Sequence, residues 1–280
     1  MISVSKPRTP AILQRNGAKW LSELQAAKKN LDAIQANPKA TPQEIAKTKK
    51  KHDDAINKYR HKNIKSELET IFNGKCAYCE SKVTTTGYGH IEHFFPKGDP
   101  QYLHLTFDWQ NLLLSCEICN NAQHKGTNFP LDSSGNPLLI NPSDGVTEIN
   151  KHLKFSWDQV DGAKIEGRDD RGKKVVEIFD LNSTSGTRKE LFKHRKKIVK
   201  DMLCVLTFSQ TIADPHHKSE AIQLLTEYCQ PTAEYSAFAL VYILPYLAHH
   251  FRIPEAIILL KQVSQRSPAY GEWARVDALP

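Results

Sequence analysis

The sequence predicts an α+β protein in which a small cysteine-rich core lies between two helical regions. Apolar residues recur at helical spacing in residues 9–72 and again from about residue 186 onward. Short strand-like runs separated by turn residues occupy residues 137–181. We therefore expect a helical hairpin in 1–72, a metal-stapled core in 73–136, a small β-extension in 137–181 and a helical region in 182–280.

The N-terminal region is predicted to contain two long helices. Thr9 and Pro10 indicate a start with proline in the first helical position. "NPKA" ends this helix, and Thr41 and Glu44 have the spacing of a capping box that starts the second. The charged run "KTKKKHDD" in that helix is either a solvated face or a phosphate contact. An apolar stripe along the first helix comprises Trp20, Leu24, Ala27, Leu31 and Ile34.

The later segments are assigned by the same patterns. "PLLINP", "LKFSW", "DGAKIEG" and "KKVVEIFDL" are predicted to be strands of the β-extension. "GTRKELFKHRKKIVKDMLCVL", "SEAIQLLTEYC" and "PEAIILLKQVSQ" are predicted to be helices. "AFALVYILPYLA" is the longest apolar stretch, and at about a dozen residues with Pro245 inside it predicts a buried helix rather than a membrane span.

Composition limits the class of protein. The chain has 280 residues, a net charge of +7 and a pI of about 9.0, which favours polyanionic partners such as nucleic acid. The start "MISVSKPRTP" lacks the apolar segment of a signal peptide. We therefore expect a cytoplasmic protein with no membrane association.

Four of the six cysteines form two Cys-x-x-Cys pairs. In a reducing compartment such pairs indicate metal ligation rather than disulfides, and four thiolates suit one tetrahedral Zn²⁺ with no open position. The alternatives are two unrelated buried pairs or an iron–sulfur cluster. Cys204 and Cys229 lie in apolar helical contexts and are expected to be small buried residues. The proposed structural zinc ligands are Cys76, Cys79, Cys116 and Cys119.

The segments framed by these cysteines resemble a known family. "CAYC", "IEHFFPK" and "NLLLSCEICNNAQHK" follow one another as in HNH nucleases with a ββα-metal core bracketed by a zinc site. The three motif positions fall on His93, Asn111 and Asn120. "FDWQNLLLSC", "FPLD", "PLLINP", "HLKF" and "IFDLN" extend the resemblance to HNH proteins found with an ATPase in Septu-type anti-phage systems and some retron systems.

The resemblance implies that His93 is the general base and that Glu92 ligates a catalytic Mg²⁺ or Mn²⁺. Asn111 is expected to bridge backbone groups and so to orient His93. His90, two residues before Glu92 on the strand, is either an additional ligand or an exposed histidine. Trp109 is expected in the core rather than stacked on a base.

The second cysteine pair is expected to lead into the helix of the ββα unit. Asn120 should open that helix and His124, four residues later, should lie on the same face as a second ligand. Lys97 and Lys125 are candidate phosphate contacts.

The activity implied by the resemblance is metal-dependent cleavage of DNA, leaving 5′-phosphate and 3′-hydroxyl ends. No P-loop is present, so an ATPase must be supplied in trans, and a hetero-oligomer follows. Helices outside the core, with the segment "KPRTPAIL", are expected to dock on it. A stand-alone restriction-type HNH enzyme, a non-catalytic zinc module and an RNA substrate remain alternatives.

Overall fold

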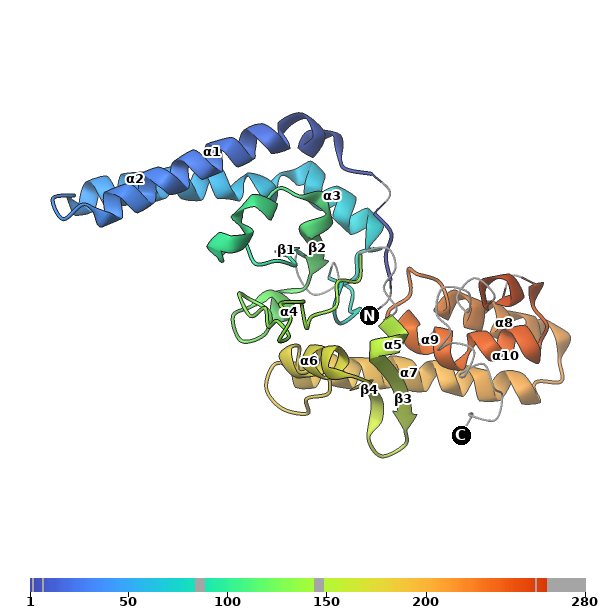
Figure 1. The fold of residues 1–280 in the computed structure, drawn as a ribbon. Helices are drawn as coiled ribbons and strands as arrows, with labels where there is room; N and C mark the ends of the chain where they lie inside the picture. The colour runs from blue at the N-terminus through green and yellow to red at the C-terminus, as the bar shows by residue number, and fades with distance from the viewer. Residues whose placement is uncertain (2, 7, 84–88, 144–148, 255, 261–280) are drawn as a thin grey trace.

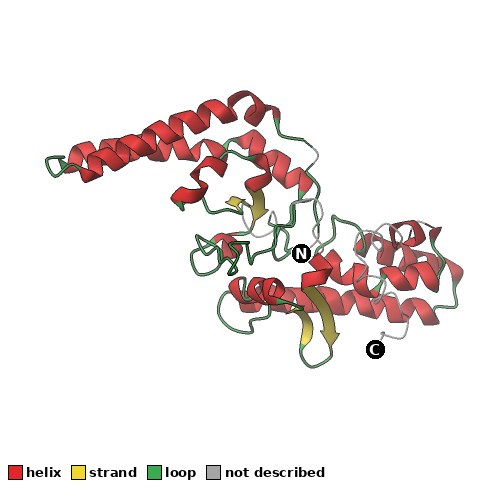
Figure 2. Cartoon of the chain, viewed as in Figure 1, coloured by secondary structure: helices red, strands yellow, loops and turns green. Residues whose placement is uncertain are grey.

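The computed structural model describes residues 1–280 except 2, 7, 84–88, 144–148, 255 and 261–280. It confirms the α+β class, because helices surround two separate two-stranded antiparallel sheets in the described residues (Figure 2). A helical arm projects from one side of the core, and the C-terminal helices pack on the other side (Figure 1).

The arm consists of α1 (Ala11–Ala36) and α2 (Pro42–Ile56), which lie side by side (Figure 1). The capping box is confirmed, since the Glu44 amide donates to Thr41 Oγ1 and the Thr41 amide donates to the Glu44 carboxylate. Thr9 is not a cap, because α1 begins at Ala11 with Pro10 before it and no side-chain cap.

The second long helix is interrupted, which differs from the prediction. Its continuation is a 3-10 turn, η1 (Asn57–Arg60), and a separate helix α3 (Lys62–Ile71). His61 ends one element and starts the next, because its Nδ1 accepts a hydrogen bond from the Asn63 amide at 3.2 Å. The break turns α3 so that its buried face, with Ile64 and Leu68, packs on the β-strands.

The core contains β1 (His90–His93), the 3-10 turns η2 (Pro100–Leu105) and η3 (Trp109–Asn111), and β2 (Leu112–Ser115). The two strands are antiparallel, with His90 opposite Ser115 and His93 opposite Leu112. Trp109 is buried, as expected.

The helix after β2 is shorter than predicted. Helix α4 (Glu117–Asn120) is a single turn that Asn120 ends rather than opens. The Asn121 side chain accepts a hydrogen bond from the Gln123 amide at 3.0 Å, and such a local bond competes with helix continuation. The chain then passes through turns to His124, so Asn120 and His124 do not share a helical face, contrary to the prediction.

The β-extension is a hairpin with a helix on either side. After α5 (Ile149–His152), strands β3 (Leu153–Asp158) and β4 (Gly162–Gly167) pair antiparallel. The predicted strand "KKVVEIFDL" is instead largely helix α6 (Asp170–Ile178), which Asp169 caps by accepting from the Gly172 amide at 2.9 Å. Val175 and Ile178, three residues apart, are both buried, a spacing that fits a helix better than a strand.

The C-terminal region contains α7 (Arg188–Thr211), α8 (Pro215–Tyr228), α9 (Ser236–Tyr242) and α10 (Leu244–His249). The expected single buried helix is therefore two short ones, with Pro245 at the start of the second. Cys229 is buried as predicted, whereas Cys204 is exposed. Part of the predicted helix "PEAIILLKQVSQ" lies outside the described residues. Within the described part of the chain, no helix has the length and apolar character of a membrane span.

Two glycines in helices are expected to respond oppositely to alanine. A Cβ on Gly172 would lie 1.8 Å from the His152 carbonyl oxygen, whereas a Cβ on Gly17 would meet nothing within 4 Å. Gly172→Ala should therefore lower the free energy of unfolding by about 2 kcal/mol or more. Gly17→Ala should raise it by about 0.5–1 kcal/mol, because alanine is the better helix former. Urea midpoints measure both, and a Gly172→Ala protein as stable as the parent would contradict the packing described here.

Candidate active site

A cavity of about 660 Å³ lies at the junction of β1, η1, α3 and the turns after α4. Glu92, His93 and Asn120 line it, which brings three of the residues predicted from the sequence together. His90, which is exposed, lines the same cavity. Because alternate residues of a strand point to the same face, His90 and Glu92 lie on one side of β1. Its wall also includes Tyr59, Arg60, Lys65 and Lys97.

His93 is buried at the end of β1 in an environment that keeps it neutral. Its Nε2 lies 3.0 Å from the Thr106 carbonyl oxygen, and the edge-to-face Tyr59 ring lies 4.6 Å away between centroids. Burial, and then the charge of Lys97, lower the pKa of His93 to about 3. Because a carbonyl can only accept, we assign the ring proton to Nε2. The Nδ1 lone pair is thereby left as the proton acceptor.

Glu92 is a buried carboxylate that is paired with Lys125. Lys125 Nζ lies 3.2 Å from Glu92 Oε1 and donates to the His93 carbonyl oxygen at 3.2 Å. Burial raises the pKa of Glu92 to about 7 although Lys125 opposes the rise. Lys125 itself has no exposed surface, so the expectation that it contacts phosphate is wrong. Its ammonium instead compensates a carboxylate that burial would otherwise protonate.

Asn111 joins the segments on either side of the cavity. Its side-chain oxygen accepts from the Phe95 amide at 2.7 Å, and its Nδ2 donates to the carbonyls of Phe95 and Leu105 at 3.1 Å each. The Asn111 carbonyl also accepts from the Phe94 amide, directly after His93. The buried amide thus links the end of β1 to the η2 turn and to β2.

The N-terminal segment supports the same junction from behind. Lys6 Nζ donates to the Trp109 carbonyl at 2.6 Å and to the Leu112 carbonyl at 2.7 Å, on both sides of Asn111. Lys6 is buried in this chain's own core, so this residue is not available to a partner, whereas docking by the rest of "KPRTPAIL" stays a prediction. The local sequence carries no signal for this contact, because more than a hundred residues separate the two groups.

Asn120 and His124 do not form the predicted ligand pair. Asn120 is half-buried and lines the cavity, but His124 is not among the lining residues. The His124 ring is buried, and the nearby charge of Arg188 reinforces burial in lowering its pKa. Both of its ring nitrogens lack a hydrogen-bond partner within the described structure.

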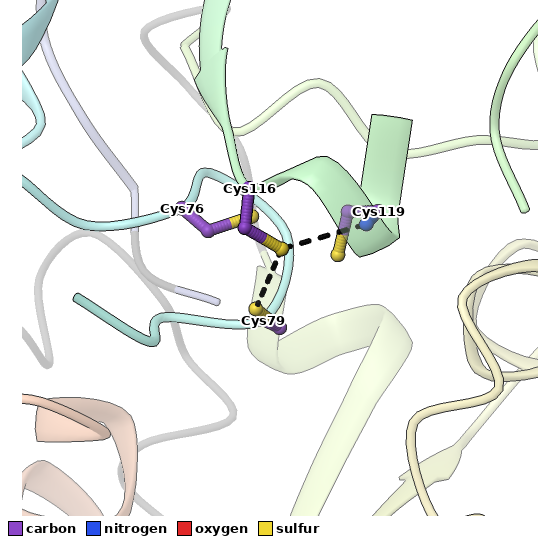
Figure 3. A group of neighbouring side chains, drawn as sticks. All are labelled: Cys76, Cys79, Cys116 and Cys119. Carbon is purple, nitrogen blue, oxygen red and sulfur yellow. Dashed lines mark hydrogen bonds between the residues drawn. The ribbon is translucent and has the colours of Figure 1, made fainter. Parts of the chain in front are cut away.

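The four paired cysteines converge on one point, as the sequence predicted. Their sulfur atoms all lie within 4.8 Å of one another, and the side chains point toward a common centre (Figure 3). Cys116 caps α4, accepting from the Cys119 amide at 3.4 Å, while the Glu80 amide donates to the Cys76 carbonyl at 3.0 Å. Each pair thus forms a tight turn, and the cluster can bind a metal ion.

The surroundings of the cluster act differently on its four thiols, since burial and then the neighbouring cysteines raise the pKa of the Cys119 thiol well above its usual value. Arg188 of α7 donates to Cys119 Sγ at 3.2 Å. Hydrogen bonds with Cys116 and Cys119, with a contribution from Arg188, lower the pKa of the Cys79 thiol well below its usual value. Since thiolates are the metal-binding form, the donor set fits a tetrahedral thiophilic ion.

The sequence did not predict that Tyr59, Arg60 and Lys65 line the cavity. They come from η1 and α3, which precede the first cysteine pair and contain no recognisable motif. Their role depends on the break after α2, which no local pattern announced.

Comparison with known proteins agrees with this geometry. The HNH endonuclease family model matches residues 76–126, which include β1, β2 and all four paired cysteines. The Septu protein PtuB of Bacillus mycoides (strain KBAB4) is 31% identical over 229 residues, which cover 72% of this chain and 68% of that protein. This chain belongs to the PtuB family of HNH endonucleases.

A second member of the PtuB family, the Septu protein PtuB of Bacillus thuringiensis, is 37% identical over 121 residues. That alignment covers 42% of this chain and 41% of the relative. No solved structure matches the chain significantly. The family resemblance seen in the sequence is thereby confirmed, and the chain is a nuclease.

Buried Lys6 should make stability depend on pH. Burial lowers its pKa from 10.5 to about 7, so between these values the unfolded chain binds more protons than the folded one. Stability relative to Lys6→Met should therefore rise with pH above about 7, by at most about 1.4 kcal/mol per pH unit. Urea unfolding from neutral to alkaline pH measures this, with exposed Lys29→Met as the control. A difference between the parent and Lys6→Met that stays constant with pH would contradict it.

Proposed function

We propose that this chain hydrolyses phosphodiester bonds of DNA, using His93 as the general base. The supporting observation is a buried, neutral histidine adjacent to a buried carboxylate in one cavity bordered by cations. The His93 ring is unprotonated at pH 7, and the negative charge of a bound phosphate would raise its pKa toward the range that suits a general base.

The surrounding residues have distinct parts in this proposal. Nδ1 of His93 accepts the proton of the attacking water, and the Thr106 carbonyl on Nε2 stabilises the imidazolium that results. The Tyr59 ring holds the imidazole plane, while Asn111 fixes the backbone on both sides of the site. Arg60, Lys65 and Lys97 place positive charge where the phosphates would lie.

Glu92 and Asn120 are the proposed ligands of a catalytic Mg²⁺ or Mn²⁺. A buried carboxylate with a pKa of about 7 fits this role, because a divalent cation would hold it ionised. The ion would stabilise negative charge on the scissile phosphate and on the leaving 3′ oxygen. His124 is omitted from the ligand set, since it does not line the cavity.

The four-cysteine cluster is proposed to hold a structural Zn²⁺. With four sulfur donors, such an ion has no position for substrate and serves to connect the two knuckles. It would lie apart from the cavity, among thiolates rather than oxygen ligands, so the two metals are chemically distinct.

We further propose that the chain acts in anti-phage defence in the cytoplasm, as the nuclease subunit of a hetero-oligomer with an ATPase. The support is its membership of the PtuB family and the absence of a P-loop from its sequence. Purification of the tagged chain from its native operon tests this, and elution without an ATPase would favour a stand-alone enzyme.

Removal of the base should abolish cleavage. His93→Ala should slow nicking of supercoiled plasmid with Mg²⁺ or Mn²⁺ by about 10²–10⁴-fold. His104→Ala is the matched control, because His104 is exposed and outside the cavity. If the parent cuts plasmid no faster than His93→Ala, the proposal fails. If the parent cuts RNA of similar length but not plasmid, the assignment of DNA fails and the nuclease mechanism stands.

Loss of one cysteine should remove the structural metal. Cys119→Ser should reduce zinc measured by mass spectrometry from about one ion per chain to well below it, and should lower the melting temperature. Cys204→Ser, an exposed cysteine outside the cluster, should change neither. A purified parent protein without stoichiometric zinc would contradict the assignment.

A further inference from the structure

The excess positive charge of the chain is concentrated on the helical arm. Residues 11–60, which comprise the arm and the η1 turn that follows it, contain eleven Lys and Arg against five Asp and Glu, a net charge of +6. The whole chain has a net charge of +7, so the other residues are almost balanced. The arm and η1 together therefore carry most of the net positive charge of the protein.

Many arm lysines have no acidic partner. Within the described structure, Lys47, Lys49, Lys50 and Lys51 of α2 are exposed and no carboxylate lies within 4.0 Å of their amino groups. By contrast, six lysines on other parts of the chain lie within 4.0 Å of a carboxylate oxygen. These are Lys154 with Glu166, Lys164 with Asp161, Lys173 with Asp170, Lys174 with Glu177, Lys193 with Glu190 and Lys197 with Asp201.

The basic run, Lys47 to Lys51 of α2, is followed along the chain by residues that line the active-site cavity. Lys47, Lys50 and Lys51 share one face of α2 by their spacing of three and four residues. The chain passes directly from α2 into η1, which contributes Tyr59 and Arg60 to the cavity. The arm projects from that point (Figure 1). Helix α2 is about 22 Å long at about 1.5 Å per residue, which matches about six phosphates along one DNA strand.

The arm, all of whose residues the structure describes, presents no large exposed hydrophobic residue, and the hollow between α1 and α2 is lined mainly by small and polar side chains. The large hydrophobic residues that are exposed in the described structure all lie outside residues 11–60. Stable protein interfaces depend on apolar or aromatic anchors, whereas binding to a phosphate backbone needs mainly unpaired cations. An acidic protein partner is therefore less well supported than a nucleic acid.

We propose that the α1–α2 arm binds the phosphate backbone of the DNA duplex that flanks the cleaved bond. This rests on the proposed DNA-cleaving function and extends it, because it assigns a substrate-binding surface outside the HNH core. Lysine contacts with phosphates carry no base information, so the arm positions the duplex without selecting a sequence.

Neutralisation of the run tests the proposal. Lys47, Lys49, Lys50 and Lys51 are changed together to Gln, and the matched control changes Lys173, Lys174, Lys193 and Lys197 to Gln. Both variants lose four positive charges, from exposed or partly exposed side chains. Fluorescence anisotropy with a labelled duplex of about 30 base pairs, in EDTA and over a range of salt concentrations, measures binding without cleavage.

The arm variant should bind DNA at least about tenfold more weakly than the control variant near physiological salt. The slope of log K against log salt should become shallower by about 0.9 for each lysine that contacts phosphate. With Mg²⁺ or Mn²⁺ present, its kcat/KM should fall while kcat at saturating DNA is retained, since the cavity is unchanged.

Equal affinities and slopes for the two variants would overturn the proposal. So would an arm variant that binds DNA like the control but no longer retains an ATPase during purification, because the arm would then be a protein-docking surface. Failure of the nuclease proposal is separable, since the anisotropy measurement involves no chemistry. In that case the parent would cleave no faster than His93→Ala, while the difference in binding between the two variants persisted.

Discussion

Convergence of four cysteine side chains is the constraint on which the rest of the core depends. Strand β2 ends at Ser115 and Cys116 follows at once, so the position of the cluster sets the position of β2. The register of β2 against β1 then places Glu92 and His93. On the other knuckle, the Ala77 amide donates to the Leu114 carbonyl at 2.8 Å. Two four-residue strands are too short to be stable alone, and a metal ion held by the cluster would compensate for the small core.

The same cluster joins the nuclease core to the C-terminal region. Arg188 reaches Cys119 from α7, and Lys75, beside the first knuckle, donates to the Ala233 carbonyl at 2.8 Å. The Ser81 hydroxyl contacts the Tyr235 hydroxyl at 2.8 Å. The C-terminal helices are thus attached to the part of the core that carries the four cysteines rather than to the cavity. The cavity is instead lined by η1 and α3, which follow the arm in the chain.

Burial shifts the pKa values of two neighbouring side chains, His93 and Glu92, in opposite directions. The charged form of a histidine and the charged form of a carboxylate are both disfavoured by burial, so His93 stays neutral while Glu92 tends to take up a proton. Neutral His93 suits proton abstraction, but Glu92 must be ionised to bind a cation. Lys125 opposes the protonation of Glu92, and it can do so only because it is buried beside it. Such strained electrostatics is typical of catalytic sites.

The sequence alone determined the parts of this protein that depend on spacing and local chemistry. Cysteine spacing predicted the cluster, the order of motifs predicted that His93, Glu92 and Asn120 would share one site, and Thr41 with Glu44 predicted a helix start. Each of these signals is built from short motifs, such as Cys76 with Cys79 or Thr41 with Glu44, whose members lie three residues apart. The spacing within each motif is therefore fixed by the sequence, whatever fold the rest of the chain adopts.

Only the tertiary structure decided the roles that depend on burial and on distant partners. Lys125 became the partner of a carboxylate, His124 was turned away from the cavity by the end of α4, and Arg60 entered it from another region. A lysine has the same local pattern whether it faces solvent or a buried carboxylate, because its environment is set by residues far away in the sequence. Helix α6 differs from the predicted strand for a related reason: its apolar run suited both structures, and the Asp169 cap and packing selected one.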